Sequence, residues 1–490
     1  MPSVVSTSSV PQLDGKVPVT KSKALGEDSS ITASQQLSVS GLSHGGAILP
    51  SNDQCAVHLE LLEVIVALKR KVEDWGTDNG FTPETAWRNY LTLATARFTI
   101  FVDSIRSKLV ERNLIPPIDV LMVWHAFMLN PGVYSRFERQ VHENKWGSNG
   151  LDWSCIQKAI DADSASFTLD ESSAVTLQEV GIHVDLLHYL NSDESFPILQ
   201  MLREKDIDNS ETSTPSTLQL ASAVDDLLQN NNIFHLNSPE VKFDLISAVQ
   251  RQFRFASKMA SFNWKRSPFF QGTLSSAVER YEAFFQMMAN NPQQMLAPTL
   301  EVDLVWHTHQ LSPSVYRAYS REVAGRFINH NDDINEQTAS SSFGEATNVY
   351  EETFGSAYAL CLCWFCEGSR HSGQPTESTI GLVKEALETE FARRRDMGLP
   401  NDMAFAKAHC SECGNHPATR CVRKGSAGDA ACGGCNGECG EGGCGGCNGE
   451  CSGRRKGFNI KSSRGAGCGS GCNGECGGCN GECGGCDNGF

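Results

Sequence analysis

The C-terminal part of the chain contains fifteen cysteines between residues 410 and 490, many of them two or three residues apart and separated by glycine. The string CGGCNGEC occurs at 432–439, 444–451 and 476–483. Cys-x-x-Cys spacing lets two thiolates reach one tetrahedral ion, and glycine allows the backbone to turn around it. Because thiolates favour soft metals, the pattern predicts a tail that binds zinc or copper(I). The predicted ligands are Cys410, Cys413, Cys421, Cys432, Cys435, Cys439, Cys444, Cys447, Cys451, Cys468, Cys472, Cys476, Cys479, Cys483 and Cys486.

Other interpretations of this tail remain open. HCSECGNH supplies His409, Cys410, Cys413 and His416, and the later Cys-x-x-Cys pairs follow at the spacing of a small zinc ribbon. Cys-x-x-Cys pairs also cycle between thiol and disulfide, which would make the tail a redox sink. A third interpretation is a low-complexity surface that binds partner proteins. The basic and acidic residues of this segment cancel, so no polybasic stripe for RNA is expected.

Three further cysteines lie in the string ALCLCWFCEG, at the predicted end of a helix. Cys361, Cys363 and Cys366 have leucine, tryptophan and phenylalanine as neighbours, and cysteine is among the residues most often buried. They are either buried thiols of the core or additional ligands of the metal system.

A histidine motif occurs twice, as WHAFMLNPGVY at 124–134 and as WHTHQLSPSVY at 306–316. Asp303 lies one helical turn before His307, and such a pair can orient an imidazole or bind a divalent ion. The first copy keeps His125 but has Leu121 where the second has Asp303. His125, Asp303 and His307 are therefore either hydrogen-bonded residues of buried helices or a metal site in the core.

Two histidine patterns are not expected to chelate an ion. His307 and His309 are two residues apart, so a straight helix points them in nearly opposite directions, and His309 is predicted to pack in the core. GIHVDLL offers His183 and Asp185, with His188 close by, as in iron oxygenases. The surrounding LQEVGIHVDLLHYL is predicted to be one amphipathic helix, which separates these side chains.

The segments that carry these residues are predicted to be helices. Apolar residues recur at spacings of three and four, and alternating strand patterns are nearly absent. The two copies align without a gap from Ile115 and Ala297, and each places an N-cap residue before a proline, Asn130-Pro131 and Ser312-Pro313. The sequence therefore predicts an all-α fold built on duplicated helix-corner-helix units.

Four regions follow from composition. Residues 1–52 are rich in serine, threonine, glycine and proline and are predicted to be disordered, 53–203 and 216–398 form two helical half-domains, and 409–490 is the cysteine-rich tail. The net charge of −17 gives no basic surface for nucleic acid. No membrane span or secretion signal is expected, which places the cysteines in the reducing cytoplasm or the nucleus.

WHTHQLSPSVY, the preceding PTLEVDLV, the first copy and the later FGEATNVYEETFGSAY resemble the glycine-rich domain-containing proteins of plants and fungi, and CLCWFCE resembles the fungal branch. The resemblance covers residues 55 to 366. It implies a helical domain whose plant members are associated with stress and hormone responses. In relatives the first copy can read W-H-x-H, whereas this chain has Phe127 there.

These observations favour a non-enzymatic interaction or regulatory protein, stress-related by resemblance, with protein partners and a tail that binds zinc or copper(I). The chain contains no Walker loop, GxSxG elbow or HExxH motif. The alternative is a metal-dependent, oxygenase-like enzyme that uses the histidines of the repeated motif.

Overall fold

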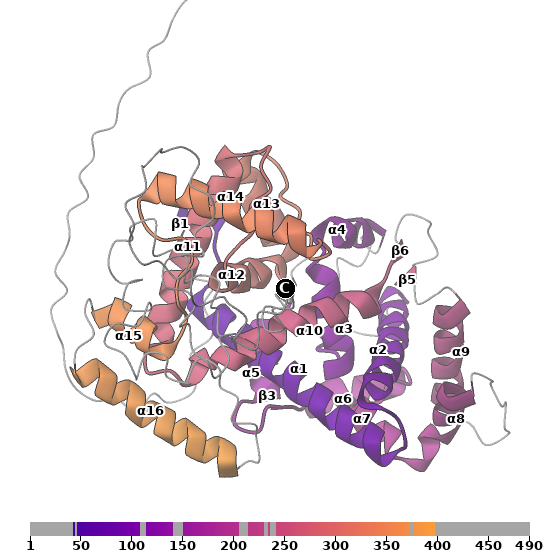
Figure 1. Cartoon of the computed structure of the whole chain (residues 1–490). Coiled ribbons are helices and arrows are strands. Elements are labelled where there is room, and N and C mark those ends of the chain that lie inside the picture. Colours follow the sequence, from indigo (N-terminus) through magenta and orange to yellow (C-terminus); the bar gives the residue numbers. More distant parts are fainter. Residues whose placement is uncertain are drawn as a thin grey trace, which may run out of the picture. The chain divides into compact units, whose positions relative to one another are not determined.

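The computed structural model describes residues 43–44, 47–107, 114–140, 150–204, 214–229, 234–235, 242–372 and 377–396 (Figure 1). Residues 1–42 and 45–46 of the segment 1–52 that was predicted to be disordered, residues 205–213 and all fifteen predicted ligands of the tail lie outside the described residues. The prediction of disorder was wrong for residues 47–52, which contain strand β2 (Ala47–Ile48) and the start of helix α1 (Asn52–Asp78).

Helices make up most of the described chain, so the prediction of an all-α fold is confirmed. The strands form three two-stranded antiparallel ribbons: β1 (Ser43–His44) with β2 (Ala47–Ile48), β3 (Ile160–Asp161) with β4 (Ser166–Phe167), and β5 (Phe234–His235) with β6 (Lys242–Phe243). The α-helices are α1 (Asn52–Asp78), α2 (Pro83–Arg106), α3 (Ile118–Met128), α4 (Pro131–Gln140), α5 (Trp153–Ala159), α6 (Glu171–Glu179), α7 (Leu186–Leu190), α8 (Phe196–Glu204), α9 (Pro215–Gln229), α10 (Leu245–Phe262), α11 (Phe270–Asn290), α12 (Leu300–Gln310), α13 (Pro313–Ala324), α14 (Glu336–Phe354), α15 (Trp364–Ser372) and α16 (Glu377–Asp396). Two single 3-10 turns, η2 (Asp193–Ser195) and η3 (Trp264–Arg266), complete the order.

Helix α1 packs into two hydrophobic clusters. One contains side chains of α2, α3 and the first half of α10, and the other contains side chains of α11, α12 and the second half of α10. One face of α1 gives Val57, Leu61, Ile65, Leu68 and Val72 to the first cluster. Another face gives Cys55, Leu59, Leu62 and Val66 to the second cluster. Because the residues of each set recur at spacings of three and four, each set lies on one face of α1, and the helix packs between the two clusters.

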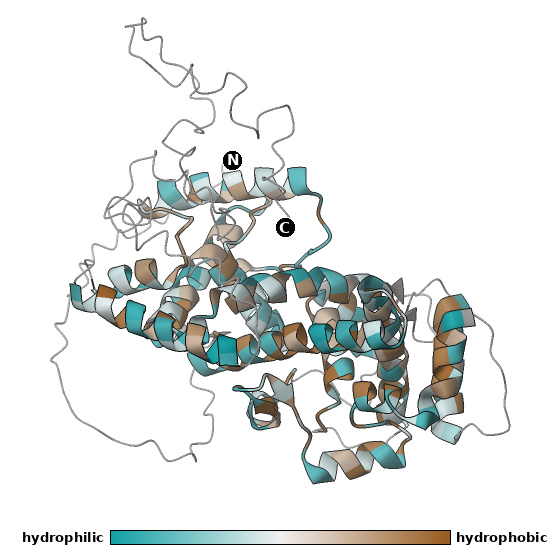
Figure 2. Ribbon diagram, turned by 60° about the horizontal axis from the view of Figure 1, so that its bottom comes forward, coloured by the Kyte–Doolittle hydropathy of each residue, from teal (hydrophilic) through white to brown (hydrophobic). Residues whose placement is uncertain are grey.

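The distribution of hydrophobic residues along the helices agrees with this packing. Figure 2 shows hydrophobic and hydrophilic residues side by side on most helices, as expected of helices with one buried face. Within the described ranges, no helix is both long enough and apolar enough to cross a bilayer.

The predicted duplication is confirmed. In the first copy α3 is followed by a corner and by α4, with Pro131 as the first residue of α4. In the second copy α12 and α13 repeat this arrangement, with Pro313 as the first residue of α13. The expected capping hydrogen bond is absent at Ser312, whose side chain makes no cap contact. The Asn130 side chain instead donates backward to the carbonyl of Ala126 at 3.0 Å.

Two helix predictions were wrong at their boundaries. The segment around GIHVDLL is not one helix, because Gly181 has a φ of +76° between α6 and α7 and a non-helical stretch follows it. Asp185 then caps α7 by accepting a hydrogen bond from the backbone N–H of His188 at 3.0 Å. Cys361 and Cys363 precede α15 instead of ending a helix, since α14 stops at Gly355 in the left-handed conformation.

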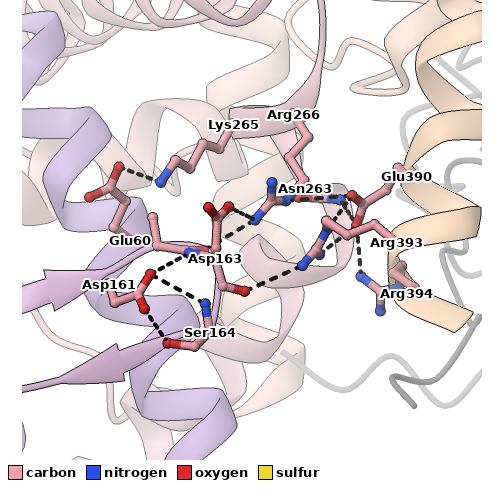
Figure 3. Close-up of polar contacts among 11 residues, drawn as sticks. Glu60, Asp161, Asp163, Ser164, Asn263, Lys265, Arg266, Glu390, Arg393 and Arg394 are labelled. Carbon is pink, nitrogen blue, oxygen red and sulfur yellow. Dashed lines mark hydrogen bonds and ion pairs between the residues drawn. The ribbon is translucent and has the colours of Figure 1, made fainter. Parts of the chain in front are cut away.

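The last helix is attached by polar contacts (Figure 3). Glu390 on α16 binds Arg393 one turn away, accepts a hydrogen bond from Asn263 at 2.9 Å and pairs with Arg266 at 3.5 Å. Arg266 also donates to the carbonyl of Ala162, in the turn between β3 and β4, at 3.1 Å. These contacts join α16 to the region between α10 and α11 and to the β3–β4 ribbon.

Candidate metal centre

Each copy of the repeat is fixed by the same two contacts. An arginine of the preceding long helix pairs with an acid in the first turn of the repeat: the buried Arg97 with Asp119 at 2.7 Å, and the partly buried Arg280 with Glu301 at 3.0 Å. The tryptophan of each motif donates from Nε1 to the tyrosine hydroxyl ten residues later, at 2.9 Å for Trp124 and 3.0 Å for Trp306. Matching contacts hold His125 and His307, each next to its tryptophan, in equivalent positions.

The second copy brings three potential ligands together. Asp303 Oδ1 lies 3.2 Å from His307 Nε2 and 3.8 Å from His330 Nε2, and the two imidazole nitrogens are 3.2 Å apart. Both histidines are buried, whereas the Asp303 side chain keeps 20% of its exposure. Asp303 and His307 are one turn apart on α12, and His330 comes from the segment after α13.

These separations fit a single metal ion. Three atoms with these spacings lie on a circle with a radius of about 2.0 Å, which is the usual bond length from zinc to nitrogen or carboxylate oxygen. Asp303 Oδ1 is buried and accepts no hydrogen bond with normal geometry, although a buried oxygen of this kind ordinarily has a partner. A cation at the centre of the three atoms would satisfy it.

The first copy of the repeat orients His330. Its Nδ1 lies 3.0 Å from the carbonyl oxygen of Leu129, and because a carbonyl only accepts, Nδ1 carries a proton. In the neutral form of the ring, Nε2 is therefore the bare nitrogen that can bind a metal ion. Metal-binding histidines usually donate their other N–H in this way. Next to it, the Asn329 side chain accepts a hydrogen bond from the backbone of Gly132 at 2.9 Å. The corner of the first copy therefore holds the segment that completes the cluster in the second copy.

The electrostatics of the two imidazoles differ. Burial, together with His330, His58 and His125, holds the pKa of His307 well below its ordinary value, so His307 is neutral and able to act as a ligand. Burial also opposes a charge on His330, but the Asp303 carboxylate, with Asp332 beyond it, raises the pKa of His330 above its ordinary value.

His125 lies in a different pair. Its Nε2 is 2.9 Å from Nε2 of His58 on α1, and Nδ1 of His58 is 2.8 Å from the Thr308 hydroxyl. Thr308 uses its own proton on the carbonyl of Leu304 at 2.7 Å, so it accepts from His58, and His125 donates to His58. Burial lowers the pKa of His125 to about 3, which keeps the ring neutral. This chain of hydrogen bonds links α3 through α1 to α12.

The sequence identified part of this cluster. Of the three residues proposed from the repeat, Asp303 and His307 come together, and His125 is absent from the group that could hold an ion. His330 takes its place, and it was missed because no regular spacing relates a residue between helices to α12. His58 was missed for a related reason, since it is a lone histidine on an apolar helix face.

Two other histidines that the sequence analysis considered, His309 and His183, have structural contacts. His309 is buried, as predicted, with Nδ1 2.9 Å from the hydroxyl of Tyr281. His183 stacks on Tyr189 with ring centroids 4.4 Å apart, and the Asp185 carboxylate caps α7. The sequence analysis excluded a metal site at His183 and Asp185 because it assumed a continuous helix, and that assumption was wrong. In the structure the Asp185 carboxylate is instead occupied by its hydrogen bond to the N-terminus of α7.

The fold and this cluster define a class: a helical protein with a duplicated tryptophan-histidine unit and a His2Asp cluster in its second copy. Residues 200–319 match the family described as "Glycine-rich domain-containing protein-like", which confirms the predicted resemblance for a region that includes α12 and its motif. The likeness to the fungal branch stays a prediction.

Two curated relatives extend this comparison. The chain is 27% identical over 264 residues to Glycine-rich domain-containing protein 1 of Arabidopsis thaliana, which covers 51% of this chain and 26% of that protein. It is 24% identical to Glycine-rich domain-containing protein 2 of the same plant, over 51% of this chain and 27% of that protein. The chain thus matches about a quarter of the length of these relatives. No solved structure matches it significantly.

Proposed function

We propose that the protein is a metal-binding protein whose helical core holds one divalent transition-metal ion between Asp303, His307 and His330. The observation that carries this proposal is the spacing of the three ligand atoms around a point about 2.0 Å from each. The orientation of His330 by a backbone carbonyl and the unsatisfied oxygen of Asp303 support it. Two imidazoles and a carboxylate suit zinc or iron(II).

The competing interpretation is a hydrogen bond within the core. His307 could donate from Nε2 to the bare Nε2 of His330, and no ion would then be needed. In that case the buried Asp303 Oδ1 has no donor, which costs about 1–3 kcal/mol for an unsatisfied buried group and more if it is charged. The metal site accounts for both nitrogens and the oxygen together.

Metal analysis of the full-length chain tests the proposal. The fifteen tail cysteines are first changed to serine so that thiolates of the tail contribute no metal, and the protein is purified without chelators. We expect about one zinc or iron ion per chain at these three ligands, and the loss of that ion in Asp303→Asn, His307→Gln and His330→Gln.

His309→Phe is the matched control. It removes a buried histidine from the same helix and introduces the residue type that the first copy has at Phe127, so the ion should stay bound. Cobalt(II) added to the metal-depleted protein should give visible bands typical of nitrogen and oxygen ligands. If the chain carries no metal and cobalt(II) gives no such bands, the hydrogen-bonded interpretation is correct.

Catalysis is a second candidate function, and one observation favours it. Three protein ligands leave at least one coordination position available, as in catalytic zinc sites and in iron enzymes with two histidines and one carboxylate. The partial exposure of Asp303 places that side of the cluster near solvent. Azide should then change the spectrum of the cobalt(II) form, and an unchanged spectrum would argue for a closed, structural ion.

The wider role that we propose is regulatory. The tail would add zinc or copper(I) sites of its own, and its thiols would remain reduced in the cytoplasm or nucleus. The link to stress responses and to protein partners rests on family resemblance. Comparing the metal content of the unsubstituted chain with that of the tail-serine variant measures how many ions the tail holds.

A further inference from the structure

Three cysteines far from the His2Asp residues in sequence also come together. The sulfur atoms of Cys361, Cys363 and Cys366 all lie within 4.8 Å of one another. Cys363 and Cys366 are buried, and Cys361 is partly exposed, which gives the group one side open to an incoming ion. Three sulfurs bound to one three-coordinate ion at a bond length of about 2.3 Å lie about 4.0 Å apart, so closure requires a shift of an ångström or less, within reach of side-chain rotation.

The backbone around these sulfurs is held in place. Three successive carbonyl groups each accept a hydrogen bond: that of Cys361 from Arg370, that of Leu362 from Trp264 Nε1 at 3.0 Å, and that of Cys363 from the N–H of Glu367 at 3.0 Å. A loop fixed at three consecutive peptides presents its side chains in a constant geometry, which lowers the cost of organising a metal site.

A buried positive charge accompanies the sulfurs. Arg370 pairs with Glu367 and donates to the carbonyl of Cys361 from Nη2, while its Nη1 is buried and makes no hydrogen bond. Burial opposes the charge on this guanidinium, but Glu367, and after it Cys366 and Cys361, raise its pKa. A buried donor with unused capacity that interacts with Cys361 and Cys366 can stabilise the negative charge of their thiolates.

We infer that Cys361, Cys363 and Cys366 form a binding site for a thiophilic metal ion, and that copper(I) is its ion. Zinc in structural sites is almost always bound by four ligands, whereas this group has three members among the residues that the structure describes. Copper(I) is a soft ion that favours thiolates. On binding, each thiol releases its proton and the metal exchanges its previous ligands for three Cu–S bonds, with no change of oxidation state. The inference is independent of the His2Asp site.

Copper(I) binding to the full-length chain with the fifteen tail cysteines changed to serine tests this site. Copper(I) is supplied under reducing conditions from a competing chelator, bicinchoninate. We expect one copper(I) per chain, three Cu–S contacts by X-ray absorption, and binding that is about tenfold weaker or worse in Cys361→Ser, Cys363→Ser and Cys366→Ser. Cys155→Ser is the matched control, because Cys155 is partly buried but lies on α5, and it should bind copper(I) unchanged.

The X-ray absorption measurement keeps the test valid if a serine variant fails to fold, because it uses the intact cluster. Fewer than three sulfur neighbours, or equal binding in Cys363→Ser and Cys155→Ser, would overturn the site. A parallel titration with zinc separates the two ions: tight zinc binding with no uptake of copper(I) would overturn the assignment of copper(I).

Discussion

His309 illustrates how one buried side chain links stability to pH. The ring is enclosed by Tyr281, Tyr316 and Tyr319, and burial lowers its pKa to about 3. In the unfolded chain the same imidazole takes up a proton near pH 6.5. Between these two values the unfolded state binds a proton that the folded state does not, so the free energy of unfolding decreases as the pH falls from 6.5 toward 3.

His309→Phe is predicted to remove this part of the pH dependence. The lowered pKa of His309 decreases the free energy of unfolding by about 2–3 kcal/mol at pH 4.5 relative to neutral pH. The His309→Phe variant should therefore lose that much less stability on acidification. Urea unfolding at pH 7 and pH 4.5 measures the difference. Tyr281→Phe is the control, because it removes the hydrogen bond to His309 but leaves the buried imidazole. Equal losses in the wild-type chain and His309→Phe would contradict the prediction.

How much of the candidate site the sequence could predict depends on the origin of each residue. Asp303 and His307 share one helix, where a separation of four residues dictates contact, so their pairing could be read from the chain. His330 approaches from outside any helix, 23 residues after His307, and its position depends on contacts with the first copy at Leu129. Such tertiary contacts have no periodic signature in a single sequence.

Long helices were predicted well because their buried faces repeat over many turns, as in α1 and α2. The errors fall where one residue overrides a pattern. Gly181 interrupts an apolar periodicity that continues on both sides of it, and Gly355 separates α14 from the cysteine loop. Both glycines adopt left-handed backbone conformations, which the surrounding hydrophobic pattern does not encode.

A glycine also determines how closely the segment before α5 approaches the corner of the second copy. Gly150 has a φ of +77°, and a methyl group added to it would lie 1.9 Å from the carbonyl oxygen of Leu311, at the corner of the second copy. The same carbonyl accepts a hydrogen bond from the N–H of Leu151 at 3.0 Å. The clash would be with backbone atoms, so neither segment can move apart without breaking the hydrogen bond between Leu151 and Leu311.

Gly150→Ala is predicted to lower the free energy of unfolding by about 3 kcal/mol, from left-handed strain together with the steric clash. Gly325→Ala is the matched control. Gly325 has a φ of +66° but open space around it, so its cost should be the strain alone, about 1 kcal/mol. Urea unfolding of both variants gives the comparison. If the two substitutions cost the same, the close approach to Leu311 does not constrain the fold.

At the scale of the whole molecule, the shared position of α1 limits the independence of the two predicted half-domains. Its two apolar faces belong to different clusters, and α10 likewise contributes Leu245 and Val249 to one cluster and Phe255 and Met259 to the other. With a boundary near residues 203–215, α10 falls in the second half-domain. It nevertheless packs in the cluster formed mainly by α1, α2 and α3 of the first half-domain.

Fragments 53–203 and 216–398 are predicted not to fold when produced separately. The first would expose the face of α1 that packs on α11 and α12, and the second would lack α1 altogether. Circular dichroism with urea titration should show no cooperative transition for either fragment, and co-production should restore one. A sharp transition in fragment 53–203 alone would show that it is an autonomous unit.

The position of α1 also sets the timing of biogenesis. Among the helices that the structure describes, α1 is synthesised first, yet α12, one of the helices that cover its second face, ends at Gln310. At ordinary rates of translation, the intervening stretch takes on the order of tens of seconds to synthesise. For that interval the nascent chain presents an uncovered apolar helix, so chaperones that recognise exposed hydrophobic segments have a defined target on α1.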